Sequence, residues 1–143
     1  MIVKDIIPIL KKSNFFMDQS DNLLYAIAFA AEKISFSTGD LLIKTEEIKP
    51  ICIVILSGNV FIQKRSRPIK VSSGSVLGLL SLINDSKPNN AVIAGSTGEA
   101  LKIDSKLFNK LISQFPDFVK KLQKCMVDSL NVQIETLEKV IDG

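Results

Sequence analysis

The spacing of the apolar residues changes twice along this chain of 143 residues, and the two changes restrict the folds that it can adopt. Between Glu32 and Asp104 the apolar residues form short runs rich in β-branched side chains, separated by Gly, Asn, Asp and Ser. Such runs predict short antiparallel strands joined by turns. On both sides of this region the apolar residues recur at helical intervals. The sequence therefore predicts an α+β chain with helices before and after a β-rich centre.

The first 31 residues predict two short helices. Residues 1–12 place Ile2, Ile6 and Ile9 at intervals typical of one helix face. Either Asp18 or Ser20 can cap a second helix, because short polar side chains accept hydrogen bonds from the free amides of a first turn. The second helix directs its apolar residues toward a core; these are Leu23, Leu24, Ile27 and Ala28.

The end of the β-rich centre predicts a hairpin. The runs 91–94 and 100–103 are apolar, and Gly95 and Gly98 stand between them with two small polar residues. A glycine-containing connection of this length is typical of a tight turn between paired strands. We therefore expect these two runs to pair with each other.

The residues from 105 to 143 predict two further helices. Asp104 or Ser105 can cap the first, and Pro116 ends it and opens the next. From 118 to 141 the apolar residues recur with a mean spacing of about 3.7 residues, close to the helical period. A small β-domain cannot cover so long a stripe, so we expect a homodimer. The predicted dimer interface consists of Val119, Leu122, Met126, Leu130, Ile134, Leu137 and Ile141.

The composition disfavours most kinds of catalysis. The chain contains no His and no Trp, which removes the commonest general base and the commonest metal ligand. Its two cysteines, Cys52 and Cys125, lack the spacing of a zinc or iron–sulfur site, and two unpaired thiols suggest a reducing compartment. We expect neither a metal nor a cofactor, and an enzyme is the least supported function.

Charge and hydropathy indicate a cytoplasmic protein without membrane contact. The 18 Lys and Arg residues exceed the 15 Asp and Glu residues by only three, too few to indicate a nucleic-acid partner. The longest apolar run covers residues 23–31, which is far shorter than the ~20 residues of a membrane-spanning helix. Residues 1–10 contain charged residues and a proline where a signal sequence would be apolar.

One basic stretch, Lys64, Arg65, Arg67 and Lys70, lies at a predicted turn. Nucleic acid or an acidic protein could bind these charges, although no aromatic residue stands between them to stack on bases. Charged residues at the edge of a sheet also prevent pairing with another chain, and a solvated edge is the favoured interpretation. The role of this stretch stays open.

Four sequence segments, in order, resemble those of the cyclic nucleotide-binding domain family, which includes catabolite activator protein-like and regulatory-subunit-like domains. The segment 36–40, Phe-Ser-Thr-Gly-Asp, is similar to a turn of that family, and 53–60 is similar to its Ile-x-x-Gly-x-Val hairpin. Gly74-Ser-Val-Leu-Gly78 is similar to the entry of its phosphate-binding cassette, and Ile103-Asp104 with Phe108 and Pro116 to its closing segment. The resemblance implies one domain over residues 1–143, with an antiparallel double-stranded β-helix (a jelly-roll-like β-roll) over 32–104 and the cassette over 74–91.

The family's two charged ligand contacts are replaced in this sequence. The resemblance implies a Glu directly after the second cassette glycine, for the ribose hydroxyl, and an Arg before the next strand, for the cyclic phosphate. Leu79 and Asn89 stand at these positions, and Lys87 in the adjacent turn is favoured as a solvated residue over a phosphate contact. Loss of two such contacts weakens binding by about 3 to 6 kcal/mol, about a hundredfold to ten-thousandfold. The residues of the degenerate pocket are Gly78, Leu79, Leu80, Ser81, Asn89, Asn90 and Ala91.

These observations predict a non-catalytic regulatory or signalling module. We expect it to bind cyclic AMP and cyclic GMP weakly and to act through homodimerisation and contacts with an unidentified protein. The alternative is a sensor whose remodelled cassette binds a small molecule or a cyclic nucleotide. The family's transcription regulators carry a DNA-reading domain after the long helix, and this sequence stops at Gly143. We therefore expect no direct DNA binding.

Overall fold

The structure, a computed structural model, describes residues 2–13, 15–46 and 49–124. The helices α1 (Val3–Leu10) and α2 (Asp21–Ala30) precede the strands, α3 (Leu79–Asn84) interrupts them, α4 (Ser105–Gln114) follows them, and residues 116–124 are helical again. The strands are β1 (Glu32–Phe36), β2 (Leu41–Ile43), β3 (Ile51–Ser57), β4 (Val60–Gln63), β5 (Pro68–Val71), β6 (Val76–Leu77), β7 (Val92–Ala94) and β8 (Gly98–Asp104).

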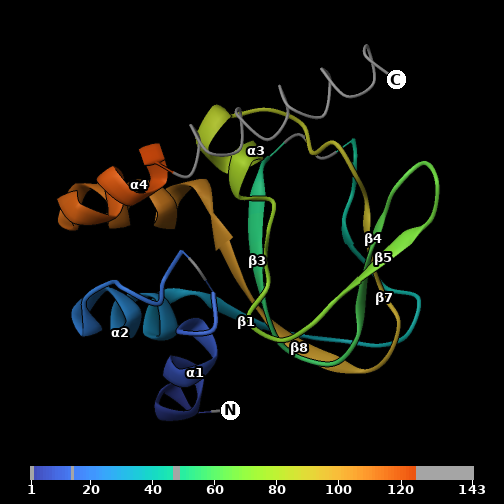
Figure 1. Ribbon diagram of the computed structural model, residues 1–143, viewed down its shortest axis with the longest axis horizontal. Helices are drawn as coiled ribbons and strands as arrows, with labels where there is room; N and C mark the ends of the chain where they lie inside the picture. Colours follow the sequence, from blue (N-terminus) through green and yellow to red (C-terminus); the bar gives the residue numbers. More distant parts are fainter. Residues whose placement is uncertain (1, 14, 47–48, 125–143) are drawn as a thin grey trace, which may run out of the picture.

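The strands form two four-stranded antiparallel sheets, in the orders β1-β8-β3-β6 and β2-β7-β4-β5. The two sheets make a roll, with α1, α2 and α4 grouped on one side and α3 at one end (Figure 1). The chain passes repeatedly from one sheet to the other, which is the topology of a double-stranded β-helix. The predicted α+β class and β-roll are therefore confirmed.

The two hairpins expected from the sequence are wrong, because their strands lie in different sheets. β3 and β4 do not pair with each other, nor do β7 and β8. The glycine-containing turns carry the chain across the roll instead, and the two turns pack together. A Cβ atom on Gly58 would lie 2.6 Å from the carbonyl oxygen of Thr97, and the backbone amide of Asn59 donates to Ser96 Oγ at 2.9 Å. A tight turn in the sequence does not reveal whether its strands share a sheet.

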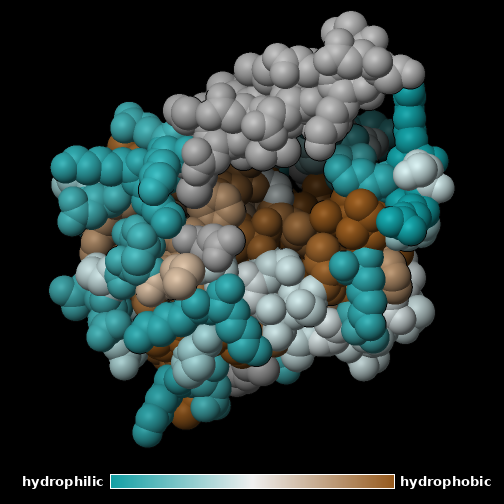
Figure 2. Space-filling view, in the orientation of Figure 1, coloured by the Kyte–Doolittle hydropathy of each residue, from teal (hydrophilic) through white to brown (hydrophobic). Residues whose placement is uncertain are grey.

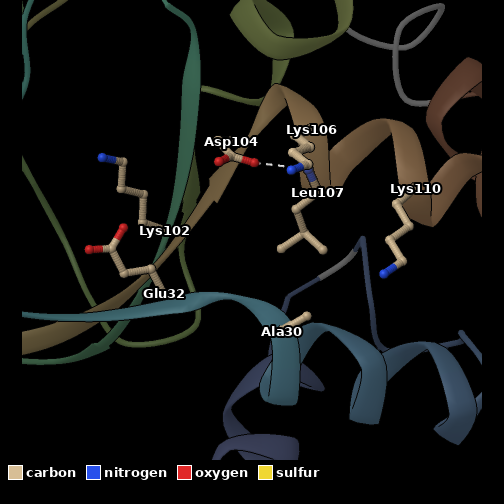
Figure 3. Close-up of a pocket in the computed structure, with 7 residues that line it drawn as sticks. All are labelled: Ala30, Glu32, Lys102, Asp104, Lys106, Leu107 and Lys110. Carbon is tan, nitrogen blue, oxygen red and sulfur yellow. Dashed lines mark hydrogen bonds between the residues drawn. The ribbon is translucent and has the colours of Figure 1, made fainter.

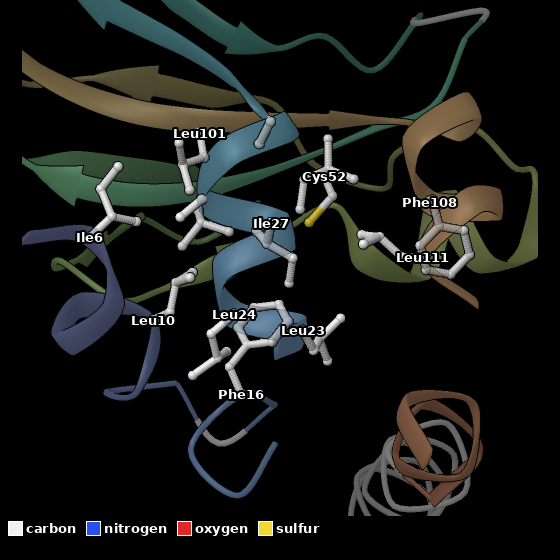
Figure 4. Close-up of a cluster of buried hydrophobic side chains, with 14 of the residues drawn as sticks. Ile6, Leu10, Phe16, Leu23, Leu24, Ile27, Cys52, Leu101, Phe108 and Leu111 are labelled. Atoms are coloured by element: carbon white, nitrogen blue, oxygen red, sulfur yellow. The ribbon is translucent and has the colours of Figure 1, made fainter. Parts of the chain in front are cut away.

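β3 separates two apolar cores, which explains its continuous apolar sequence. Cys52, Val54 and Leu56 face the helices, in a core that also includes Leu24 of α2. Ile53 and its neighbour Ile55 face the interior of the roll. Figure 4 shows the first core, where Ile27 of α2 lies close to Cys52. Alternate residues of a strand point to opposite faces, so both faces of β3 are buried.

The structure decides between the alternative helix caps. Ser20, not Asp18, caps α2, because its hydroxyl accepts a hydrogen bond from the Leu23 amide at 3.3 Å. Asp104, not Ser105, caps α4, because its carboxylate accepts from the Leu107 amide at 2.8 Å. In both cases the cap is the residue just before the first helical turn. Within the described ranges, no helix has the length and hydropathy needed to cross a membrane.

Candidate functional site

The cassette region begins with a backbone turn that only glycine accommodates. Gly78 has a φ of +87° and directly precedes α3. A Cβ atom at this position would clash with the carbonyl oxygen of Ile51 and also approach the Ile43 side chain to 3.2 Å. The left-handed conformation is itself unfavourable for other residues. Gly78 therefore brings the first turn of α3 close against β2 and β3, at the end of the roll.

A cavity of about 380 Å³ opens beside α3. Figure 2 shows apolar surface inside this hollow, between α3 and β4. We call it the cassette cavity. Its lining residues are Phe15, Ile43, Ile62, Lys64, Val76, Leu77, Gly78, Leu79, Leu80, Ser81, Pro88, Asn89, Asn90 and Val92. Six of the seven predicted pocket residues are among them, and Lys87 is not.

Ala91 is the one predicted pocket residue that does not line the cavity. The backbone amide of Gln63 donates to the Ala91 carbonyl at 2.9 Å, which continues the pairing of β4 with β7. Val92 faces the interior of the roll. Because neighbouring residues in an extended chain face opposite sides, Ala91 faces outward while Asn90 and Val92 face the cavity.

Leu79 has two roles at the position where the resemblance expects a Glu. Its side chain is only 8% exposed and packs in the core between the helices and the sheet. It also lines the cassette cavity. Since a buried carboxylate is unfavourable without a partner, this environment fits Leu and disfavours Glu. No carboxylate lines the cavity among the described residues.

Lys64 is the one charged residue of the cavity lining, and the sequence analysis did not place it there. In β4, Val60 and Ile62 face the interior of the roll. Lys64 follows at the same two-residue period, so the alternation that points Ile62 inward also points Lys64 toward the cavity. Extending the β4–β7 register, in which Ile62 pairs with Val92, brings Lys64 opposite Asn90.

The other basic residues of this stretch lie elsewhere. Arg65 and Arg67 are exposed between β4 and β5 and do not line the cavity. Lys70 pairs across the strands with Phe61, one residue out of step with the inward-facing Ile62. The stretch therefore divides into one residue at the cavity and three directed to the surface. The four residues form one basic cluster in the sequence, but the alternation of the strands directs them to different sides of the sheet.

A second cavity, of about 280 Å³, lies between the end of α2, β8 and α4. It is lined by Ala30, Glu32, Lys102, Asp104, Lys106, Leu107 and Lys110 (Figure 3). Two of its lysines, Lys102 and Lys110, point in different directions and lie on opposite sides of this view (Figure 3). Asp104 already caps α4. The second cavity therefore offers no single point at which its charges meet a ligand.

The described residues carry no obvious nucleophile or metal centre. No group of three or more His, Cys, Asp or Glu side chains that could hold a metal ion occurs among them. Cys52 is a free thiol in the core, where burial raises its pKa to about 12. The thiol therefore stays protonated at neutral pH and is a poor nucleophile. Cys125 lies outside the described residues.

Two residues of the predicted dimer interface fall in the described part of the chain. Leu122 is 5% exposed and belongs to the core of its own protomer. Val119 is half-buried. Leu122 is therefore covered without a second chain. The other residues of this prediction, Met126, Leu130, Ile134, Leu137 and Ile141, lie outside the described residues.

Of the comparisons with known proteins, the comparison with solved structures gives a match. No model of a protein family matches the chain, and no curated protein matches it. Among solved structures, the chain is similar to one described as "Sp-2Cl-cAMPS bound to PKAR CBD2", with a TM-score of 0.71 and 20% sequence identity. The similarity covers 98% of this chain and 89% of that one. Together with the two sheets and α3, it shows that the chain has the fold of a cyclic nucleotide-binding domain.

Proposed function

We propose that this chain is a non-catalytic regulatory module that binds cyclic AMP and cyclic GMP weakly and acts through contacts with other protein chains. The observation that carries the proposal is the chemistry of the cassette cavity. Leu79 and Asn89 line it at the positions where the resemblance expects Glu and Arg, and no carboxylate lines it among the described residues. A cyclic nucleotide would lose the acceptor for its ribose hydroxyl and the planar partner for its phosphate.

A catalytic function has less support in this chain. The sequence contains no His, and the Cys52 thiol is held protonated by burial. General acid–base or nucleophilic catalysis needs a group that changes protonation near neutral pH and that a substrate can reach. The cassette cavity contains Lys64 and three neutral polar side chains, without a base beside a nucleophile.

The second candidate function is a sensor whose remodelled cassette binds a small molecule or a cyclic nucleotide. A specific observation favours it: the cassette cavity is open, with a volume of about 380 Å³, and is not filled by Leu79. Volumes of this size are typical of small-molecule sites with mainly apolar walls and few polar groups. This alternative keeps the regulatory role and changes only the input that the module detects.

A thermal-shift panel distinguishes the two candidates. Nucleotides and small metabolites are added to the purified chain, and a ligand present at 100 times its dissociation constant stabilises the fold by about 2.7 kcal/mol. A shift with a compound other than a nucleotide supports the sensor, and an absence of shifts throughout the panel supports the contact module. A large shift with micromolar cyclic AMP contradicts the contact module and supports a cyclic-nucleotide sensor.

Sedimentation tests the contact with a second copy. The apolar stripe that starts at Val119 leads us to expect a homodimer at concentrations of tens of micromolar. The measurement is the sedimentation coefficient of the full chain at several concentrations. A monomer throughout this range would contradict self-association, and the module would then act only through other proteins.

A further inference from the structure

The cassette cavity combines many apolar side chains with a single charge. Nine of its lining residues have apolar side chains, and Lys64 is the one charged residue among them. Ile62 and Val92 form part of the apolar wall from β4 and β7. Apolar walls stabilise the hydrocarbon part of a ligand, whereas a few polar groups fix its orientation. The cavity is therefore suited to a ligand with an apolar body and a negative charge at one end.

The charge of Lys64 is available to such a ligand. Its ammonium group has no ion pair or hydrogen bond with any of the described residues. Arg65 and Arg67, its neighbours in the sequence, do not line the cavity. Lys64 carries its charge on a flexible stem, and it follows β4 at a position where the alternation of the strand points toward the cavity that it lines. Lys64 can therefore contact an anionic group at the cavity opening without first breaking an ion pair or a hydrogen bond with a described residue.

Two amide side chains accompany Lys64 on the same side of the cavity. Extension of the β4–β7 register places Asn90 opposite Lys64, and Asn89 is the next lining residue along the chain. An Asn side chain can donate two hydrogen bonds through its NH₂ group. The ammonium and the two amides together can satisfy the oxygens of a small anionic group.

The number of charges separates a carboxylate from a phosphate monoester, but not from a cyclic phosphate, which is a diester and also carries a single negative charge. A phosphate monoester carries about 1.5 to 2 negative charges at pH 7, whereas a carboxylate carries one. One lysine with no second cation in the lining balances a single negative charge. The buried Leu79 provides no acceptor for a sugar hydroxyl. The single cation therefore disfavours a phosphate monoester, and the missing acceptor at Leu79 disfavours a cyclic sugar phosphate, whereas a carboxylate attached to an apolar body needs neither a second cation nor that acceptor.

We infer that the cassette cavity binds an organic carboxylate with an apolar body, whose carboxylate contacts Lys64 and the amide of Asn90. This inference rests on the second function proposed above, the small-molecule sensor. The cation is Lys64, directly after β4, whereas the resemblance expects an arginine from the cassette itself. The ligand class thereby changes from a sugar phosphate to a carboxylic acid.

The test compares two probes that differ in charge and little in shape: 4-phenylbutyrate and its uncharged amide, 4-phenylbutanamide. Both are titrated into the ¹⁵N-labelled full chain, and binding is measured from backbone amide shifts at residues 78–81 and 89–92. The variants are Lys64→Gln and, as a matched control with the same loss of charge, Arg65→Gln. Both replaced residues are exposed, and unchanged urea midpoints verify that both variants fold.

We expect the unmodified chain to bind 4-phenylbutyrate about tenfold more tightly than the amide, since one partly solvated charge contact is lost with the amide. Lys64→Gln should reduce this preference to less than twofold, and Arg65→Gln should leave it unchanged. The preference should decrease as salt is raised. Equal affinity for both probes, no binding of either, shifts at other residues, or an unchanged preference in Lys64→Gln would each overturn the inference.

A titration with cyclic AMP on the same samples separates this inference from the proposed function. If 4-phenylbutyrate does not bind and cyclic AMP binds only weakly, the carboxylate site is wrong and the contact module stands. If cyclic AMP binds at low micromolar concentration, the proposed function is wrong whatever 4-phenylbutyrate does.

Discussion

Individual glycines determine where the cassette cavity forms. Gly78 and Gly39 both have φ near +90°, but their surroundings differ. A Cβ atom on Gly39 would have no atom within 4 Å, whereas one on Gly78 would clash with the Ile51 carbonyl oxygen. The two positions therefore separate the conformational cost of a side chain from its steric cost.

We predict that Gly78→Ala destabilises the chain more than Gly39→Ala does. Gly39→Ala should cost about 1 to 2 kcal/mol, from the left-handed conformation alone. Gly78→Ala should cost about 2 kcal/mol more, because α3 must also move away from β3. Urea unfolding of both variants measures the free energies. Equal losses would show that the backbone of Ile51 does not restrict position 78.

Position 89 allows a test of whether the absence of an arginine limits the binding of cyclic AMP. We predict that Asn89→Arg tightens the binding of cyclic AMP by about tenfold to a hundredfold, because the guanidinium provides the missing phosphate partner. Asn89 is exposed, so the longer side chain needs no space in the core. Asn109→Arg adds the same charge at an exposed position of α4 and should leave binding unchanged. An equal gain from both variants would indicate nonspecific attraction to the added charge.

At the scale of elements, the segment between α1 and α2 is tied to the final helical segment. The rings of Phe16 and Phe118 stack with centroids 5.9 Å apart. Nearby, Lys121 Nζ donates a hydrogen bond to Asp18 Oδ2 at 3.1 Å. The start of the last helix is therefore fixed by an aromatic contact and an exposed ion pair. Asp18 lies two residues before Ser20, the cap of α2, and its carboxylate instead accepts the hydrogen bond from Lys121.

The hydrogen bond from Lys121 lowers the pKa of Asp18 below its ordinary value. A carboxyl whose pKa is lower in the folded state stabilises the fold above the unfolded pKa, and this contribution is lost as the pH falls through the folded pKa. We predict that Lys121→Met raises the Asp18 pKa toward the ordinary value, as measured by NMR titration of the carboxyl. Lys120→Met removes the same charge one residue away and should have little effect. A pKa that stays low in Lys121→Met would contradict the assignment of the pair.

Elements with local signals were predictable from the sequence, and their pairing was not. The positions of α2 and α4 follow from apolar spacing and from a polar residue just before the first turn, although the choice between Asp104 and Ser105 needed the structure. The strand runs follow from β-branched residues. Which sheet each strand joins depends on contacts between distant turns, such as that of Gly58 with Thr97.

The candidate site shows the same division. The resemblance of residues 74–91 to the family's cassette implied the residues on the α3 side of the cavity, including Gly78 and Asn90. Lys64 lies far from the cassette in the sequence, so no local motif links the two. Only the register of β4 with β7 brings Lys64 to Asn90. The alternation of Val60, Ile62 and Lys64 was the available signal. It predicts that Lys64 lies on the inward side of the roll, but it does not predict which cavity Lys64 lines.

At the scale of the whole molecule, the fold is that of a solved cyclic nucleotide-binding domain, and the change in ligand chemistry is our proposal. The roll, α3 and the flanking helices match a solved cyclic nucleotide-binding domain over nearly the full length, at a TM-score of 0.71. The cavity walls nevertheless include Leu79, Asn89 and Lys64 in place of the expected acidic and arginine contacts. Shape and chemistry can diverge because the fold depends on the two cores and the turns, whereas ligand affinity depends on a few polar groups.

The most direct test is a calorimetric titration of the full, unmodified chain with cyclic AMP and with cyclic GMP. Loss of two charged contacts weakens a micromolar site by about 3 to 6 kcal/mol, so we predict dissociation constants in the millimolar range for both. A dissociation constant in the low micromolar range for either nucleotide would contradict the central proposal that this β-roll binds cyclic nucleotides only weakly.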